Sequence, residues 1–222
     1  MPLSKQPYTS YNWFFLVPFI LWVFIAFPFT DGKYLQLCFA AVNTHHNPFA
    51  DFLMYYTTWI GEGITITIIL TTLFIFPAFR NWWYFITALL CNVLPTIVTQ
   101  SIKNIIDAPR PLKYFGEASW IHLDPSWPKL FSYSFPSGHT TGAFSMFCLL
   151  AMLLPKKYKP LGVLFFFLSL SVAYSRIYLA AHFLKDVYWG SIIGVSSSLL
   201  VFAIMQYFKP YFFRKESVTS KQ

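Results

Sequence analysis

The chain has 222 residues, of which 56% are hydrophobic, 22% aromatic and only 11% charged. Soluble domains carry about 25% charged residues, so this composition excludes a disordered protein, argues against an ordinary soluble enzyme and predicts a membrane protein. The formal net charge of +8 would suggest nucleic-acid binding in a soluble protein. In a membrane protein it raises a different question, namely on which face of the bilayer those charges lie.

Apolar stretches without charged residues predict where the chain crosses the bilayer. A spanning helix needs about 20 mostly apolar residues. In chain order, the six predicted spans are about 12–30, 63–80, 82–102, 138–155, 160–180 and 186–208. Residues 34–62 contain several polar and charged side chains and predict interfacial or re-entrant helices. The predicted fold class is therefore all-α: a polytopic membrane bundle of six transmembrane helices plus interfacial helices, in a single domain over residues 1–222.

The distribution of Lys and Arg predicts the orientation of the bundle. Six spans place both termini on one side, which holds nine Lys and Arg residues and one Glu. The other side holds seven Lys and Arg residues and seven acidic ones. Because Lys and Arg are enriched in cytoplasmic loops, we expect both termini, with a tail at 209–222, in the cytoplasm of a multi-pass inner-membrane protein. The positive excess then faces anionic lipid, and no nucleic-acid partner is expected.

Three polar clusters lie at span ends on the opposite, periplasmic or exterior side. The first follows the third predicted span, the second begins the fourth, and the third lies between the fifth and sixth. Their members are Lys103 and Arg110, then Ser137, Gly138 and His139, then Arg176, His182 and Asp186. Three separate chain segments thus bring cations, histidines and a carboxylate to one membrane face. Anchoring a helix in a membrane does not require such a set of ionisable side chains, so the set indicates a functional site.

The cations and the helix start predict a phosphate site. Guanidinium groups such as those of Arg110 and Arg176 suit phosphate oxygens, and Lys103 adds a third positive charge. The sequence Ser137-Gly138 opens a helix whose free N–H groups can hold an anion, with the serine hydroxyl as a further donor. The motif contains no metal-ligand grouping, so we predict no metal and no cofactor, with three cations in place of a divalent ion.

The histidines and the aspartate predict nucleophilic catalysis. His182 and Asp186 are four residues apart, so on a helix they would share one face. A carboxylate there can hold one ring nitrogen protonated and leave the other free to attack phosphorus. His139 is then the acid that protonates the leaving group and later helps to activate water.

These clusters resemble the three-part signature of the type 2 phosphatidic acid phosphatase superfamily. The match runs through Lys103-(six residues)-Arg110-Pro111, then Pro136-Ser137-Gly138-His139, then Ser175-Arg176-(five residues)-His182-(three residues)-Asp186. The resemblance implies a six-span, metal-independent phosphatase of lipid phosphates and diphosphates. It also implies that His182 is the nucleophile, that Asp186 orients it, that His139 is the acid and that the remaining motif residues hold phosphate.

The predicted partner is a membrane lipid phosphate that reaches the site laterally from the bilayer. The resemblance suggests a lipid A phosphate or undecaprenyl diphosphate first, with phosphatidylglycerol phosphate or phosphatidic acid as alternatives, and no residue chooses among them. A second function class is a non-catalytic lipid-phosphate-binding or transport protein, because charges at the membrane edge also suit transport. The loop 112–135 is a candidate lid, and His45 and His46 are interfacial residues or line the site entrance.

Overall fold

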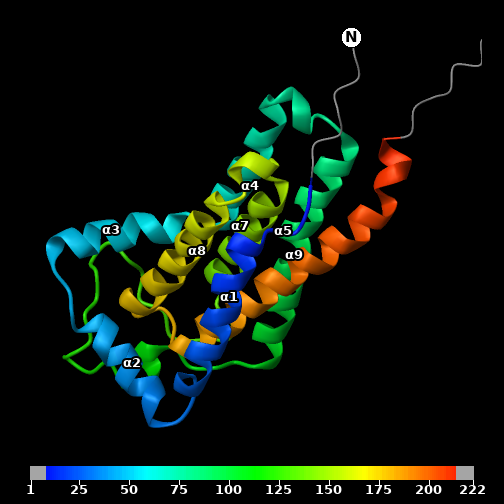
Figure 1. Ribbon diagram of the computed structural model, residues 1–222. Coiled ribbons are helices and arrows are strands. Elements are labelled where there is room, and N and C mark those ends of the chain that lie inside the picture. The colour runs from blue at the N-terminus through cyan, green and yellow to red at the C-terminus, as the bar shows by residue number, and fades with distance from the viewer. Residues whose placement is uncertain (1–8, 214–222) are drawn as a thin grey trace, which may run out of the picture.

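The computed structural model describes residues 9–213, which form a bundle of helices (Figure 1). The α-helices are α1 (Trp13–Ala26), α2 (Lys33–Asn43), α3 (Pro48–Trp59), α4 (Gly63–Thr72), α5 (Trp82–Ile105), α6 (Pro111–Tyr114), α7 (Gly138–Leu153), α8 (Leu161–Tyr178) and α9 (Leu184–Phe212). Short 3-10 helices are η1 (Phe27–Phe29), η2 (Leu73–Ile75), η3 (Pro77–Phe79) and η4 (Lys156–Tyr158). The predicted tail at 209–222 lies outside the described residues from 214 onward, and its first residues instead continue α9.

The chain is an all-α membrane protein with three to five candidate spans. Helices α5, α8 and α9 are each long and apolar enough to cross a bilayer. Two further candidates are bent pairs: α1–η1 with α2, which turn by 113°, and α3 with α4–η2, which turn by 63°. Helix α7 is apolar but has only 16 residues. The all-α class and the helices between 34 and 62 agree with the prediction, whereas the helices predicted at 63–80 and 138–155 are shorter than expected.

Prolines account for the shortened helices. The stretch predicted as one span at 63–80 is broken after α4, because Phe76 adopts an extended conformation before Pro77 and the chain restarts as η3. Helix α7 ends at Leu153, two residues before Pro155. Proline within a stretch is tolerated in membrane helices, but it removes a backbone donor and favours an end or a kink.

Helix α7 forms the centre of the bundle and packs against α5, α8 and α9 (Figure 1). Almost all of its side chains are buried. Two glycines of α9 permit the close approach of α7: a Cβ atom at Gly190 would lie 2.8 Å from the Ser137 carbonyl oxygen, and one at Gly194 would clash with the Thr141 carbonyl. Small residues at this spacing let membrane helices pack closely. The start of α7 is thereby held against the start of α9.

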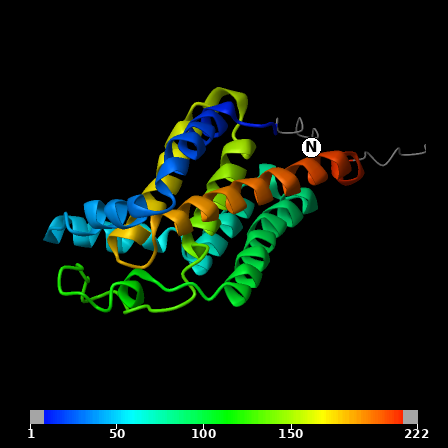
Figure 2. The same ribbon diagram turned by 90° about the horizontal axis from the view of Figure 1, so that it is seen from below.

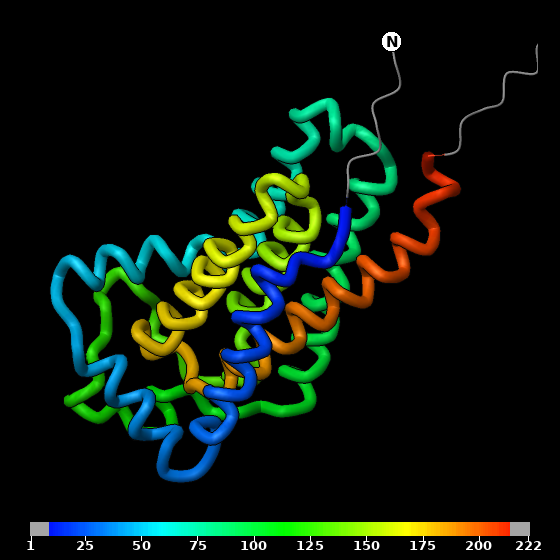
Figure 3. The backbone as a smooth tube through the Cα atoms, viewed as in Figure 1, coloured from blue at the N-terminus to red at the C-terminus, as the bar shows by residue number. Residues whose placement is uncertain are grey.

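An outer layer made of α2, α3 and the loop 112–135 covers the end of the bundle opposite the two described chain ends (Figures 2 and 3). Asn43 fastens this layer. Its buried side chain donates to the carbonyl oxygens of His122 (2.9 Å) and Tyr178 (2.8 Å) and accepts from the His122 amide (2.9 Å). One side chain thus links α2, the loop and the end of α8.

The histidines of the outer layer contact residues of that layer. His46 stacks on His122 with ring centroids 3.7 Å apart. Nε2 of His122 lies 2.7 Å from Asp51, whose carboxylate also accepts from the Tyr178 hydroxyl at 2.6 Å. His45 is exposed and follows α2, and its Nδ1 lies 2.9 Å from the Ala41 carbonyl of that helix. These contacts hold α3 and the loop 112–135 together.

Candidate active site

His182 and Asp186 come together at the turn between α8 and α9. His182 lies before α9 begins, and Asp186 lies in the first turn of that helix. The carboxylate accepts the backbone N–H of Phe183 at 2.9 Å, which caps the helix, and it lies 3.4 Å from Nδ1 of His182. The prediction that His182 and Asp186 share one face of a helix is therefore wrong, because His182 precedes α9. The spacing of four places the two groups together because the carboxylate folds back to cap its own helix.

Ser134 is a further member of the site that the sequence analysis missed. Its hydroxyl donates to Oδ2 of Asp186 at 2.5 Å and lies 3.4 Å from Nδ1 of His182. The only sequence signal was a small polar residue three positions before the Ser137-Gly138-His139 cluster. With the Phe183 amide, this hydroxyl holds the buried aspartate in one orientation.

Lys103 and Arg110 reach the site from opposite ends of the connection between α5 and α6. Lys103, in the last turn of α5, is buried, and its ammonium group donates to the Tyr133 carbonyl at 2.5 Å. Arg110 precedes α6, and its Nη1 lies 3.0 Å from the Ala181 carbonyl and 3.4 Å from Nε2 of His182. The guanidinium therefore stands beside the ring nitrogen that faces away from the aspartate.

Arg176 lies in the last turn of α8 and is only 1% exposed. Its Nη1 donates to the Thr58 hydroxyl at 2.6 Å, and its guanidinium carbon lies 4.7 Å from the ring centre of Trp127 in the loop 112–135. This arrangement places one face of the guanidinium on an aromatic ring and leaves Nε without a hydrogen-bond partner among residues 9–213. Thr58 and Trp127 were not predicted as contacts of the cation.

We call Lys103, Arg110 and Arg176 the cation cluster. Within residues 9–213, none of the three forms an ion pair with a carboxylate. Buried or half-buried cations are costly to desolvate unless an anion compensates them. The cluster is therefore suited to bind a tetrahedral anion such as phosphate. Over the same residues, no three His, Cys, Asp or Glu side chains gather as potential metal ligands.

The second sequence cluster begins α7. Ser137 is the N-cap of the helix, and its fully buried hydroxyl oxygen accepts from the Thr140 hydroxyl at 3.0 Å. Its backbone N–H donates to the Asp186 carbonyl at 3.0 Å, which ties the start of α7 to that of α9. A Cβ atom at Gly138 would have no neighbour within 4 Å, so the helix start opens onto free space. That free space fits the predicted role of Gly138 in an anion cradle.

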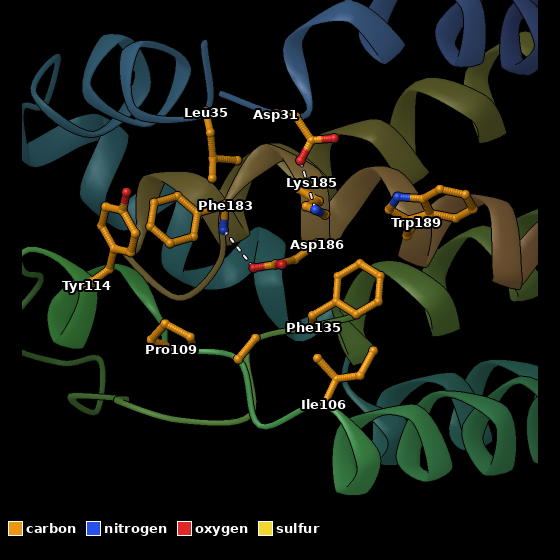
Figure 4. A pocket seen from close by; sticks show the side chains of 11 residues that line it. Asp31, Leu35, Ile106, Pro109, Tyr114, Phe135, Phe183, Lys185, Asp186 and Trp189 are labelled. Carbon is orange, nitrogen blue, oxygen red and sulfur yellow. Dashed lines mark hydrogen bonds and ion pairs between the residues drawn. The ribbon is translucent and has the colours of Figure 1, made fainter. Parts of the chain in front are cut away.

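Two cavities flank these residues. One of about 210 Å³ is lined by Lys103, Gly138 and His139, together with residues of α4 and α5. The other, of about 530 Å³, is mostly apolar and backs onto Asp186 between α2 and α9 (Figure 4). An ion pair of Lys185 with Asp31 at 2.8 Å stands in that second cavity. Ser137 lines neither cavity.

Burial and positive charge both act on His182, which lies outside the spanning helices. The side chain is 2% exposed, and this burial, followed by the nearby Arg110, Arg176 and Lys103, lowers the pKa of His182 well below its ordinary value of 6.5. The imidazole is therefore neutral over the physiological pH range. A neutral imidazole is the form in which a ring nitrogen can act as a nucleophile.

The family model of the PAP2 superfamily matches residues 80–210 of this chain. This range contains all eight predicted site residues. Dolichyldiphosphatase 1 of Dictyostelium discoideum is 29% identical over 196 residues, covering 81% of this chain and 77% of that protein. The crystal structure of Aquifex aeolicus LpxE superposes with a TM-score of 0.62 at 25% identity, covering 78% of this chain and 98% of the other. A PAP2-type phosphatidylglycerolphosphate phosphatase from Bacillus subtilis gives 0.60 at 22% identity, covering 91% and 99%. The chain therefore belongs to the PAP2 superfamily, as a membrane lipid phosphate phosphatase.

Proposed function

We propose that the protein hydrolyses a phosphate monoester or diphosphate on a membrane lipid through a phosphohistidine at His182. The observation that carries this proposal is the position of the nucleophile. One ring nitrogen of His182 faces a buried aspartate, and the other lies beside a cation cluster that has no carboxylate partner among residues 9–213. Such a set can bind phosphate and present a nitrogen lone pair to its phosphorus.

In the first step, Nε2 of His182 attacks phosphorus while the bond from phosphorus to the leaving oxygen breaks. Asp186 accepts the Nδ1–H and keeps the ring in the reactive tautomer. The separation of 3.4 Å is long for a hydrogen bond, and such contacts commonly shorten in the enzyme–substrate complex. The cation cluster and the N–H groups at Gly138 neutralise the phosphoryl oxygens. These charges take the part that a divalent ion plays in other phosphoryl transfers, so the reaction requires neither metal nor cofactor.

His139 acts as the general acid in the first step and as the general base in the second. It gives a proton to the leaving oxygen as the phosphohistidine forms. In the second step, it takes a proton from the water that attacks the phosphohistidine, which releases inorganic phosphate and restores His182. His139 lines the same cavity as Lys103 and Gly138, which supports this assignment.

The proposed topology has six crossings, by α1, α4, α5, α7, α8 and α9, in one membrane-embedded domain with both termini in the cytoplasm. The ends of the described chain support it, because Thr9 accepts hydrogen bonds from Gln206 (2.9 Å) and Lys209 (2.8 Å). The site lies toward the opposite end of the bundle (Figure 1). The Lys and Arg excess on the side of the termini then orients the site toward the periplasm or the exterior.

The substrate in this proposal is a lipid phosphate that stays anchored in the outer leaflet. A lipid A phosphate or undecaprenyl diphosphate is favoured, with phosphatidylglycerol phosphate and phosphatidic acid as the alternatives. The similar proteins are named as a dolichyl diphosphatase and a phosphatidylglycerolphosphate phosphatase, so both diphosphates and monophosphates belong in the test.

Phosphate release from vesicles tests the proposed function. Purified protein is incubated with each of the four lipids, with and without EDTA, and inorganic phosphate is measured. We expect release from at least one lipid at a rate that EDTA leaves unchanged within about twofold, since the cation cluster supplies the positive charge. Loss of activity in EDTA that magnesium restores would overturn the metal-independent mechanism. Lipid binding or transport without phosphate release would support the non-catalytic alternative.

The lowered pKa of His182 predicts the acid side of the pH profile. The acid limb of kcat/KM reports ionisations of the free enzyme. We expect the midpoint of this limb to lie below pH 6.5, the pH at which an ordinary histidine is half protonated. The measurement is kcat/KM from pH 4 to 8, corrected for the second ionisation of the substrate phosphate at about pH 6. An acid limb centred at pH 6.5 or above after this correction would contradict a neutral, buried nucleophile.

A further inference from the structure

A second carboxylate, Glu62, stands beside the proposed acid. Glu62 precedes α4, and its Oε2 lies 2.8 Å from Nε2 of His139. The pair is at ion-pairing distance, although the donor angle at Nε2 does not meet that of a regular hydrogen bond. Glu62 lies outside the segment that matches the family and outside the three sequence clusters. In the sequence it is a lone carboxylate between two glycines.

The backbone holds this carboxylate in place. Gly61 packs so tightly against the start of α7 that a Cβ atom there would lie 2.8 Å from the His139 carbonyl oxygen and 2.6 Å from Cγ1 of Val172. Neither backbone nor a packed valine can yield that space readily, so a glycine is required at this position. The turn that carries Glu62 is therefore pressed against the residue that its carboxylate contacts.

Nε2 of His139 is buried, and the Glu62 carboxylate lies 2.8 Å from it. Within residues 9–213 this nitrogen forms no regular hydrogen bond with any other group. Trp127 packs edge-on against the ring, with centroids 6.3 Å apart. Both Glu62 and His139 line the cavity of about 210 Å³ that also contains Lys103 and Gly138. The carboxylate thus borders a cavity that one member of the cation cluster and the start of α7 also line.

We propose that Glu62 is the positioning residue for His139, an inference that rests on the proposed function. Its carboxylate accepts the Nε2–H and so directs Nδ1 toward the leaving oxygen. In the first step the Nδ1 proton passes to that oxygen, and the imidazole is left neutral with its Nε2–H still on Glu62. In the second step Nδ1 takes a proton from the attacking water, and Glu62 stabilises the imidazolium that results. Each histidine of the site then has its own carboxylate: Asp186 for the nucleophile and Glu62 for the acid.

Leaving-group dependence tests this assignment. Glu62→Gln and Glu62→Ala are compared with wild type on a lipid alkyl phosphate and on an aryl phosphate such as p-nitrophenyl phosphate. An alkoxide needs protonation to depart, whereas a nitrophenolate does not. We expect kcat/KM on the alkyl phosphate, which reports only the steps up to the phosphohistidine, to fall about tenfold to a hundredfold, a part of the 10²–10⁴ that general acids contribute. On the aryl phosphate, we expect kcat/KM to change by less than about threefold, because formation of the phosphohistidine then needs no proton.

The matched control is Glu117→Gln, which removes the charge of an exposed glutamate whose contact with Lys129 is 3.8 Å. It should leave both rates unchanged. The isosteric Glu62→Gln variant keeps the side-chain volume, so it carries the test even if Glu62→Ala folds poorly. Size-exclusion chromatography and thermal melting in detergent verify folding of each variant.

A double-mutant cycle separates positioning from a structural role. In the His139→Ala background, Glu62→Gln should cause no further loss, because the group that it positions is gone. Equal losses of kcat/KM on both leaving groups, an additive loss in that background, or unchanged kcat/KM on the alkyl phosphate would each overturn the inference. The wild-type rate distinguishes the two proposals, since a wild type without phosphatase activity contradicts the proposed function itself, whereas an active wild type with an unaffected Glu62 variant contradicts only the role of Glu62.

Discussion

The His182→Ala variant is expected to lose at least about 10⁴-fold in kcat on every substrate that the wild type hydrolyses. Removing a nucleophile in other covalent mechanisms has effects of this size, which corresponds to about 5.5 kcal/mol of transition-state stabilisation. Nε2 of His182 is the ring nitrogen beside Arg110, at 3.4 Å, and in the proposed mechanism every substrate forms its bond to phosphorus there. The loss should therefore be independent of the leaving group, unlike the loss that we expect for Glu62 variants.

A trapping experiment checks the same variant by a second route. Wild type quenched during turnover of ³²P-labelled substrate should retain label that is stable in base and labile in acid, as a phosphoramidate is. His182→Ala should retain none. His45→Ala is the control, since His45 is exposed and its Nδ1 lies 2.9 Å from the Ala41 carbonyl of α2. Label that persists on the His182→Ala protein would assign the nucleophile to another residue.

The Asp186→Asn variant is expected to lose between about 10² and 10⁴ in kcat while keeping its fold. An aspartate-to-asparagine change in a serine protease triad lowers kcat by about 10⁴, because the histidine is held in the wrong tautomer. Here Asp186 lies 3.4 Å from Nδ1 of His182 and is held by Ser134 and by the Phe183 amide. An amide in its place removes the negative charge that stabilises the proton on Nδ1, and Nε2 loses its reactive lone pair.

Two companion variants sharpen this measurement. Ser134→Ala removes the 2.5 Å hydrogen bond to the carboxylate but not the charge, so its loss should be smaller, about tenfold. Asp31→Asn is the control, because its exposed carboxylate pairs with Lys185 and, within residues 9–213, with no other cation. Rates are measured by phosphate release, and thermal melting in detergent checks folding. Activity of Asp186→Asn within threefold of wild type would remove Asp186 from the mechanism.

The local parts of the site could be predicted from the sequence because each depends on neighbours in the chain. The cluster Ser137-Gly138-His139 begins a helix as expected, since a serine N-cap and the residues after it define a helix start locally. The proximity of His182 and Asp186 was also predictable from a spacing of four, although the capping turn rather than a helical face produces it. The ends of the apolar helices were less predictable, because Pro77 shortens the helix there.

The sequence by itself determined the membrane setting, the all-α class, the family and the order of the functional residues, because composition, apolar periodicity and motif spacing are properties of the chain. Only the tertiary structure decided which partners complete the site. Ser134 reaches Asp186 across a separation of 52 residues, Thr58 reaches Arg176 across 118, and Glu62 reaches His139 from the turn before α4. Such contacts depend on how α4, α7, α8 and α9 pack, and no local pattern encodes that packing. The glycines at 61, 190 and 194 are required by this packing, because a Cβ atom at each would clash with the backbone of a neighbouring segment. That requirement cannot be recognised without the positions of those backbones.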